Sequence, residues 1–383
     1  MKITVKTQSG LEDLLAKELK ELGLSEIKPG RRMVSCEGEL EHLYKINYSS
    51  RLALKAMVPV LSFDIKEAKD VYKNALTFDW NKWLKPKQSF VIRFSVFSDL
   101  FNNSLYAAQL FKDAIVDNIR EKTGQRPSVE LKNADISFDL YINKNQCIIS
   151  IDSSGEPLFK RNYKTKASKA PLNEILAAGM LQIANWDKKQ TLINPMCGSG
   201  TLLFEALFYA ENRPPQFYRK KWSFQKWPEF DAELFYRVKE EANSKIVNPS
   251  ARIIGLDNDP ITIKFLRRNL VELELDEKIS TQMTDFFEWN HRAEDAILIM
   301  NPPYDERLKL HDVKKFYQSI GDHLKQNFKG NTAWIITSNK DAMKSIGLKT
   351  TAKIPLFNGP LECRFMKFEL FDGRLKEKIN IEI

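Results

Sequence analysis

The apolar residues along the chain alternate between helical and extended spacing, which is typical of proteins that mix helices with strands. In the N-terminal part, short apolar or alternating runs predict strands at 2–6, 33–38, 58–61, 90–96, 136–142 and 146–152. Apolar residues three and four positions apart predict helices at 10–22, 39–48 and 104–122. We therefore expect one small α+β unit over residues 1–48 and a second over residues 49–155.

From residue 156 onward, the pattern changes to short, continuously apolar strands that alternate with helices. The strands are predicted at 190–193, 253–256, 279–285 and 296–300. Helices are predicted over 202–208 and 261–272, after the first and second of these strands. Such alternation forms a doubly wound α/β sheet, whose ligands bind at the carboxyl ends of the strands. Residues 156–383 are therefore expected to form a catalytic domain, with an insertion at about 211–250.

The turn after the first of these strands carries two glycines, in the run Asn194-Pro195-Met196-Cys197-Gly198-Ser199-Gly200-Thr201. A glycine has no side chain, so a ligand can approach the backbone there. A P-loop would need a lysine after Gly200, and a dinucleotide fingerprint would need a third glycine where Leu203 stands. S-adenosylmethionine is the remaining candidate, and an ordinary tight turn is the alternative. The expected cofactor contacts are Asn194, Pro195, Cys197, Gly198, Gly200 and Thr201.

Two further strands end in side chains that suit a nucleoside and an amine. Asp257 and Asn258 follow the strand at 253–256, where a carboxylate can accept hydrogen bonds from both ribose hydroxyls. The run Asn301-Pro302-Pro303-Tyr304 follows the strand at 296–300, and its prolines force a rigid, extended exit. The Asn301 amide oxygen and the Pro302 carbonyl oxygen can then accept from one exocyclic amino group, while Tyr304 stacks on the base.

The sequence N-P-P-Y after a buried strand resembles the motif of methyltransferases that act on exocyclic amino nitrogens. With P-M-C-G-S-G-T, G-L-D, T-D-F-F and N-P-P-Y-x-E-R-L, it resembles the THUMP-containing 23S rRNA guanine-N2 methyltransferase family, RlmL-like and close to the YpsC group. The resemblance covers nearly all of the chain and extends to 158–163, 170–174 and 358–364. One departure is Asp305, where the family often has Gly.

This resemblance implies a class I S-adenosylmethionine-dependent methyltransferase sheet (Rossmann-like), preceded by a ferredoxin-like segment at 1–48 and a THUMP RNA-binding domain at 49–155. It implies that Asp285, beside Phe286, accepts from the adenine amino group of the cofactor; a helix cap is the alternative role of such an Asp. It further implies methyl transfer to N2 of a guanine in 23S rRNA. The implied catalytic residues are Asn301, Pro302, Pro303 and Tyr304, with Asn301 also beside the cofactor.

The charge of the chain favours a polyanion as partner. The 383 residues carry a formal net charge of +9, which suits RNA. Basic residues gather before the catalytic domain, and those expected to contact the RNA backbone are Lys160, Arg161, Lys164, Lys166 and Lys169. A solvated basic linker is the alternative. The insertion at about 211–250 alternates aromatic with basic residues, which predicts either base stacking or a local hydrophobic plug.

Several other kinds of site are not expected. The four cysteines are scattered without a C-x-x-C pair, and the four histidines lack metal-ligand spacing, so we expect neither a metal site nor disulfides. No apolar run reaches the length of about 18 residues that a membrane span needs, and the N-terminus does not resemble a signal peptide. We expect a cytoplasmic monomer.

Three alternative functions remain open. A tRNA guanine-N2 methyltransferase shares the THUMP and N-P-P-Y pattern, so tRNA is the alternative partner. An N6-adenine or N4-cytosine methyltransferase shares N-P-P-Y alone. A non-catalytic RNA-binding or assembly protein belongs to another class, and such a protein would not need the run Asn301-Pro302-Pro303-Tyr304.

Overall fold

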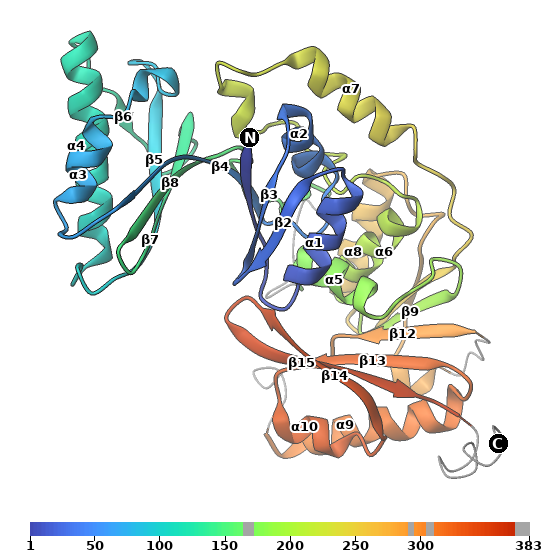
Figure 1. Cartoon of the computed structure of the whole chain (residues 1–383). Helices are drawn as coiled ribbons and strands as arrows, with labels where there is room; N and C mark the ends of the chain where they lie inside the picture. Colours follow the sequence, from blue (N-terminus) through green and yellow to red (C-terminus); the bar gives the residue numbers. More distant parts are fainter. Residues whose placement is uncertain (164–171, 290–294, 304–309, 372–383) are drawn as a thin grey trace. The chain divides into compact units, whose positions relative to one another are not determined.

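The computed structural model describes residues 1–163, 172–289, 295–303 and 310–371 (Figure 1). The chain divides into two compact units, and each of them is built from three stretches that are not contiguous in the sequence. The first unit holds Met1–Thr7, Leu15–Lys160 and Arg219–Glu241, and the second holds Gln8–Leu14, Arg161–Tyr218 and the chain from Ala242 onward. A piece of the predicted insertion therefore belongs to the N-terminal unit.

An eight-stranded sheet forms the frame of the first unit, in the order β2-β3-β1-β4-β8-β7-β5-β6. Its strands are β1 (Lys2–Lys6), β2 (Ser25–Gly30), β3 (Met33–Glu37), β4 (Lys55–Asp64), β5 (Ser89–Phe97), β6 (Ser128–Val129), β7 (Ile136–Asn143) and β8 (Gln146–Asp152). The helices of this part of the chain are α1 (Glu12–Glu21), α2 (Leu40–Ser49), α3 (Asp70–Leu76) and α4 (Ser104–Thr123), with a 3₁₀ turn η1 (Trp80–Lys82).

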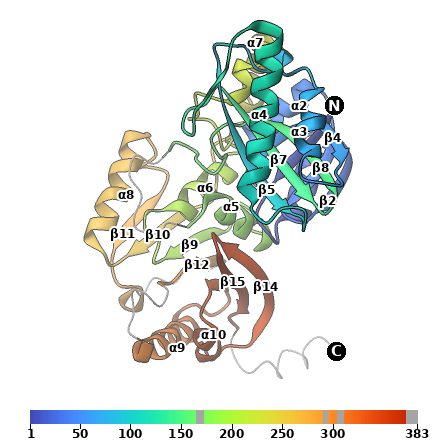
Figure 2. The same ribbon diagram turned by 90° about the vertical axis from the view of Figure 1, so that its left-hand side faces the viewer.

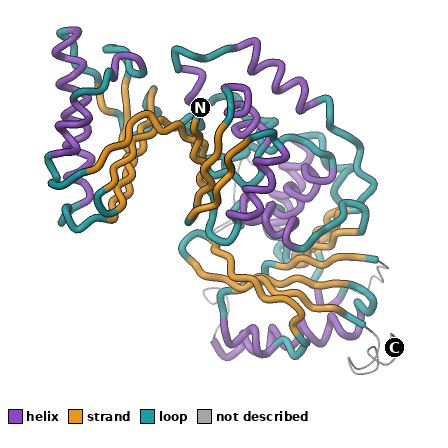
Figure 3. Tube along the Cα trace, in the orientation of Figure 1, coloured by secondary structure: helices purple, strands orange, loops and turns teal. Residues whose placement is uncertain are grey.

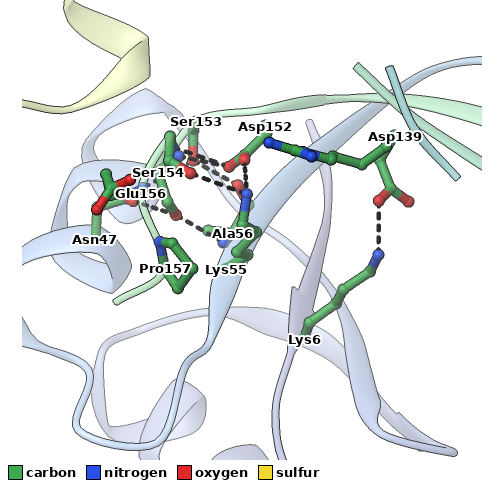
Figure 4. A network of polar contacts seen from close by, with 12 residues as sticks. Lys6, Asn47, Lys55, Ala56, Asp139, Asp152, Ser153, Ser154, Glu156 and Pro157 are labelled. Atoms are coloured by element: carbon green, nitrogen blue, oxygen red, sulfur yellow. Dashed lines mark hydrogen bonds and ion pairs between the residues drawn. The ribbon is translucent and has the colours of Figure 1, made fainter. Parts of the chain in front are cut away.

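The strand β4 joins the two predicted N-terminal domains into one sheet, because it pairs antiparallel with β1 on one side and with β8 on the other. Two lysines strengthen this junction. Lys6 on β1 lies 2.7 Å from the Asp139 carboxylate on β7, and Lys55 on β4 pairs with Asp152 at the end of β8 (Figure 4). The buried Asn47 amide on α2 donates to the Ser153 hydroxyl at 2.8 Å.

Residues 219–241 pack onto the first unit as a hydrophobic plug. Trp222, Phe224 and Trp227, around the 3₁₀ turn η2 (Ser223–Lys226), are all buried. The Phe224 ring lies 4.8 Å from that of Tyr44 on α2, measured between centroids. The aromatic side chains are therefore part of a core, and they are not available for base stacking.

Two basic residues of the same segment bind groups of the first unit. Arg219 is buried, and its guanidinium donates to the carbonyl oxygens of Ser154 at 2.7 Å and Glu156 at 2.8 Å. Lys226 forms an ion pair of 2.5 Å with Asp135. The segment continues into helix α7 (Ala232–Asn243). Of the two readings that the sequence allowed, the packing supports the plug.

The second unit contains a seven-stranded sheet in the order β11-β10-β9-β12-β13-β15-β14 (Figures 2 and 3). Its strands are β9 (Thr191–Pro195), β10 (Ile253–Asp257), β11 (Ser280–Met283), β12 (Ala296–Met300), β13 (Thr332–Thr337), β14 (Thr350–Asn358) and β15 (Leu361–Glu369). The first five strands are parallel, whereas β15 runs antiparallel to both β13 and β14.

Helices cover both faces of this sheet, as a doubly wound fold requires. The helices are α5 (Glu174–Ile183), α6 (Thr201–Ala210), α8 (Pro260–Glu272), α9 (Leu310–Asn327) and α10 (Lys340–Ser345), with a 3₁₀ turn η3 (Phe286–Glu288). Figure 1 shows α5, α6 and α8 on one face, with α9 and α10 on the other. Tyr317, Leu324 and Phe328 of the α9 region are fully buried in one cluster with Leu298 and Met300 of β12.

Candidate active site

The predicted site residues converge where the strand order of the second sheet reverses. The chain passes from β9 outward to β10 and β11, and then returns to place β12 on the other side of β9. Such a switch point is where doubly wound sheets bind ligands, outside the carboxyl ends of the strands. The glycine loop follows β9, Asp257 ends β10, and Asn301 follows β12.

The two glycines of the loop have different roles. Gly200 has a φ of +79° and precedes α6, and a Cβ atom on it would lie 2.5 Å from Cδ1 of Leu266 on α8. Gly200 is therefore needed for close packing between the loop and α8. Gly198 has a φ of +56°, and a Cβ atom there would meet nothing within 4 Å. The space beside Gly198 fits a ligand that lies against the backbone.

Asp257 holds the glycine loop against β10. One carboxylate oxygen accepts from the Gly198 N–H at 2.8 Å, and the other accepts from the Asp259 N–H at 3.0 Å. The loop is also tied by the Cys197 N–H, which donates to the Leu256 carbonyl at 2.8 Å. Each carboxylate oxygen has a second lone pair, so Asp257 can still accept from a ribose hydroxyl. The sequence did not predict this anchoring role.

Asp285 and its neighbours form the far side of the site. The Asp285 carboxylate accepts from the Asn258 amide at 3.2 Å and from the Phe287 N–H at 2.9 Å, the latter as the cap of η3. Both roles foreseen for Asp285 are thus compatible with its geometry. The Phe286 ring is buried and stacks with Phe328 at 5.8 Å, so only the backbone of Phe286 can face a cofactor.

Asn194 links the strand of the glycine loop to the strand of the N-P-P-Y run. Its buried amide nitrogen donates to the Ile299 carbonyl on β12 at 2.7 Å. This contact aligns β9 with β12 at the switch point. Asn301 and Pro303 are half-buried and Pro302 is buried at the end of β12. Tyr304 and Asp305 lie outside the described residues.

Cys197 has no role as a nucleophile here. Burial raises the pKa of its thiol well above the ordinary value, and the Asp257 charge acts in the same direction. A neutral thiol is a poor nucleophile. The side chain packs instead against β10, since a Cβ atom on Gly255 would lie 3.2 Å from its sulfur.

Arg161 does not fit its expected contact with RNA. Its side chain is only 1% exposed, and its Nε lies 3.2 Å from Oε1 of Glu205 on α6. The Tyr163 hydroxyl donates to the same oxygen at 3.1 Å. Burial, followed by the Glu205 charge, raises the pKa of Tyr163 well above its ordinary value, which keeps the hydroxyl protonated. Lys160, by contrast, is exposed and pairs with Glu156.

The buried cluster of Arg161, Tyr163 and Glu205 was not predicted from the sequence. The available signal was Glu205 itself, because it is an acid within the apolar helix sequence L-L-F-E-A-L-F. A buried carboxylate needs a partner, so such a position predicts a cation or donor from elsewhere in the chain. The remaining linker residues Lys164, Lys166 and Lys169 lie outside the described residues.

We expect Asp257→Ala to weaken binding of S-adenosylhomocysteine by about 10- to 150-fold, since a hydrogen bond to a charged group is worth about 1.5–3 kcal/mol. Asp257→Asn, which keeps one acceptor oxygen, should lose less. Asp276→Ala, an exposed acid after α8, is the control and should bind like the wild type. Titration calorimetry measures all three, and unchanged affinity in Asp257→Ala would remove Asp257 from the site.

Two kinds of feature are missing from the described ranges. Within residues 1–163, 172–289, 295–303 and 310–371, no helix combines the length and apolarity of a membrane span. The same ranges hold no group of three or more His, Cys, Asp or Glu side chains arranged to bind a metal ion.

Known proteins match this chain in all three of its parts. The RMKL-like methyltransferase domain model matches residues 161–367, the THUMP domain model 66–152, and the RlmL ferredoxin-like domain model 2–55. These matches confirm the expected fold class and the resemblance drawn from the motifs. The domain bounds expected from the sequence, at 48 and 155, remain predictions.

Individual relatives cover most of the chain. The Synechocystis protein "Putative RNA methyltransferase slr0064" is 36% identical over 94% of this chain and 95% of its own length. A Cellvibrio japonicus "Ribosomal RNA large subunit methyltransferase K/L" is 33% identical over 94% of this chain, which spans only 50% of that relative. The crystal structure of SMU.472, "a putative methyltransferase complexed with SAH", has a TM-score of 0.86 and 25% identity, and the match covers 97% of this chain and 99% of that one.

Proposed function

The chain belongs to the RMKL-like methyltransferase family, and we propose that it transfers a methyl group from S-adenosylmethionine to the exocyclic N2 of a guanine in 23S rRNA. The observation that carries the proposal is the position of Asn301-Pro302 directly after β12, across the switch point from the glycine loop. The names of the K/L relatives, which act on large-subunit rRNA, support the substrate.

The residues proposed to hold the cofactor fit its chemistry. The open space beside Gly198 suits the methionine end, while Asp257 offers lone pairs to the ribose and Asp285 to the adenine amino group. When bound, S-adenosylmethionine supplies a methyl group activated by the sulfonium. The protein must then orient the nitrogen that receives the methyl group.

Asn301 and Pro302 are proposed to orient this nitrogen. The N2 amine of guanine is conjugated with the ring and is a poor nucleophile. Two acceptors, the Asn301 amide oxygen and the Pro302 carbonyl, hold its two N–H groups and direct the nitrogen lone pair toward the methyl group. Proximity and orientation of this kind can supply much of a rate enhancement. The proton leaves to water after transfer, once the nitrogen has become acidic.

A guanine in a helix cannot present N2 in this way, so the base is flipped into the site. The rigidity that Pro302 and Pro303 give to the chain after β12 keeps the two acceptors in place while the base enters. A tRNA guanine remains the alternative substrate, because the same two acceptors would serve it equally.

We expect the wild-type protein to label 23S rRNA when it is given methyl-labelled S-adenosylmethionine and total RNA from cells that lack the protein. The RNA is separated by size after the reaction, and the label in each fraction is counted. Label in the tRNA fraction would support the tRNA alternative. RNA that stays unlabelled in every fraction would favour the non-catalytic reading.

A further inference from the structure

The start of strand β15 lies at the same edge of the second sheet as Asn301. The strands β12 and β13 are parallel, and Met300 at the end of β12 is paired with Ile335. The strand β15 runs antiparallel to β13, and its Arg364 is paired with Thr337, the last residue of β13. Arg364 is therefore almost level with Asn301 along the strands. It lies two strand spacings away from β12, about 10 Å.

Arg364 is held by a packed strand and still reaches solvent. The turn before β15 is exposed, and Leu361 at the start of the strand is 49% exposed. Phe365 and Met366, which follow Arg364, are buried in the second unit. The Arg364 side chain is 30% exposed. Its guanidinium can thus meet a ligand at the carboxyl edge, while the backbone beneath it is fixed by the sheet.

The guanidinium of Arg364 uses only one of its three nitrogens within the protein. Its Nη1 lies 2.5 Å from Oε1 of Glu362 and also donates to the Cys363 carbonyl at 3.2 Å. Within the ranges that the structure describes, Nε and Nη2 contact no other residue. These two nitrogens carry parallel N–H groups along one side of the guanidinium, an arrangement that matches two neighbouring acceptors.

Neutral polar groups between Asn301 and Arg364 are already hydrogen-bonded within the protein. The Thr337 hydroxyl oxygen accepts from the Tyr317 hydroxyl at 3.0 Å and from the Asn339 N–H at 3.2 Å. The Asn339 side chain caps α10. These groups do not compete for a base, so the donors that this part of the edge offers are those of Arg364.

The proposed reaction needs a second contact to select its base. Two acceptors can hold any exocyclic amino group, so Asn301 and Pro302 do not distinguish guanine from adenine. Guanine carries two neighbouring acceptors, O6 and N7, on the side of the ring system that lies away from N2. A bidentate arginine is the commonest specific partner of these two atoms. Adenine has an amino group in place of O6, and it would face the arginine donors with another donor.

We propose that Arg364 determines the specificity for guanine, by donating from Nε and Nη2 to N7 and O6 of the flipped base while Asn301 and Pro302 hold its N2. Glu362 keeps the guanidinium in position through Nη1. The base then lies along the carboxyl edge from β12 toward β15. This proposal rests on the proposed function, because it takes N2 of guanine as the methyl acceptor.

The test compares two 23S rRNA transcripts made in vitro, one with guanosine and one with 7-deazaguanosine. The analogue replaces N7 by a C–H group and keeps O6 and N2. Single-turnover transfer to each transcript gives the preference of a protein for guanosine. The preference of the wild type is then divided by that of Arg364→Ala, because any effect of the analogue on RNA folding acts on both proteins and cancels.

This ratio should be about 10 to 150, since a hydrogen bond from a charged donor is worth about 1.5–3 kcal/mol. Arg364→Ala should also slow transfer to the guanosine transcript, while its affinity for S-adenosylhomocysteine stays that of the wild type. Arg364→Lys keeps the charge but lacks the planar pair of donors, so it should retain only part of the preference.

The matched control is Arg268→Ala on α8. Arg268 also pairs with a carboxylate, since its Nε lies 2.8 Å from Oε1 of Glu272, and it belongs to the same unit. This variant should show the wild-type preference for the guanosine transcript.

Two outcomes would overturn the assignment of Arg364. The first is a wild-type preference in Arg364→Ala together with slower transfer to both transcripts, which would mean that Arg364 only holds the start of β15 through Glu362. The second is an equal loss of preference in Arg268→Ala. Failure of the wild type to methylate the guanosine transcript would instead count against the proposed function itself.

Discussion

Asn301→Ala is expected to slow a single turnover of methyl transfer by about 10²–10³-fold while leaving the fold intact. Removing one preorganised polar contact at a reacting group has a cost of this size, by analogy with oxyanion-hole donors. The contact matters most as the amine lone pair turns toward the methyl group, so its loss should raise the barrier more than it weakens binding. Rapid-quench measurement with saturating RNA and cofactor gives the rate.

A stable Asn301→Ala protein with near wild-type transfer would remove Asn301 from catalysis. The control is Asn339→Ala at the end of the neighbouring strand β13. The Asn339 side chain caps α10 by accepting from the N–H groups of Asp341 and Ala342, both at 2.9 Å. The control should lose about 1 kcal/mol of stability, as helix caps do, with little change in rate. If Asn301 only capped its turn, the two variants would behave alike.

Arg161→Ala is expected to destabilise the second unit by about 3–5 kcal/mol, because it leaves the Glu205 carboxylate buried without its cation. Glu205 has no exposed side-chain surface, and its carboxylate also accepts from the Tyr163 hydroxyl. Thermal or denaturant unfolding of the full-length protein measures the change. A unit of about 200 residues should lose roughly 2–4 °C of Tm per kcal/mol.

Lys160→Ala is the matched control, since it removes the same charge one residue earlier from an exposed surface pair. Its stability should stay within about 0.5 kcal/mol of the wild type. The effects on RNA binding should be reversed. Lys160→Ala should reduce the salt dependence of RNA binding, whereas Arg161→Ala protein that is still folded should show the wild-type salt dependence. Equal stability of the two variants would contradict the buried ion pair.

The sequence predicted the catalytic sheet well where short, continuously apolar strands end in polar residues. The strands that contain Asn194 and Asp257, and the strand that ends just before Asn301, are buried almost throughout, so their hydrophobic runs are unambiguous. Motif spacing then places those three residues at one edge. The position of each was therefore predictable, and the comparisons confirm the family that the motifs suggested.

What the sequence could not predict depends on contacts between distant segments. The strand β2 (Ser25–Gly30) was missed, because it is an exposed edge strand with almost no apolar residues. The return of residues 219–241 to the first unit depends on the pairing of Phe224 with Tyr44, which are far apart in sequence. For the same reason, Arg161 resembled a linker cation until Glu205 was placed beside it.

The hydrogen bonds that anchor the glycine loop also could not be predicted from the sequence pattern. Asp257 was chosen for the ribose from its place after a strand, and the structure adds the hydrogen bond from Gly198. Gly200 was chosen for the ligand, but its lack of a side chain serves the packing of Leu266. The sequence motifs predicted which residues line the site, whereas the contacts that Asp257 and Gly200 make within the protein are seen only in the structure.

The central claim is methyl transfer to the amino group at N2 of guanine, and nucleoside mass spectrometry of the reaction product tests it most directly. Total RNA from cells that lack the protein is methylated with the purified enzyme, digested to nucleosides and compared with a reaction that uses Asn301→Ala. The account predicts N2-methylguanosine from the wild type and almost none from Asn301→Ala in the same time. N6-methyladenosine or N4-methylcytidine as the new nucleoside would contradict it.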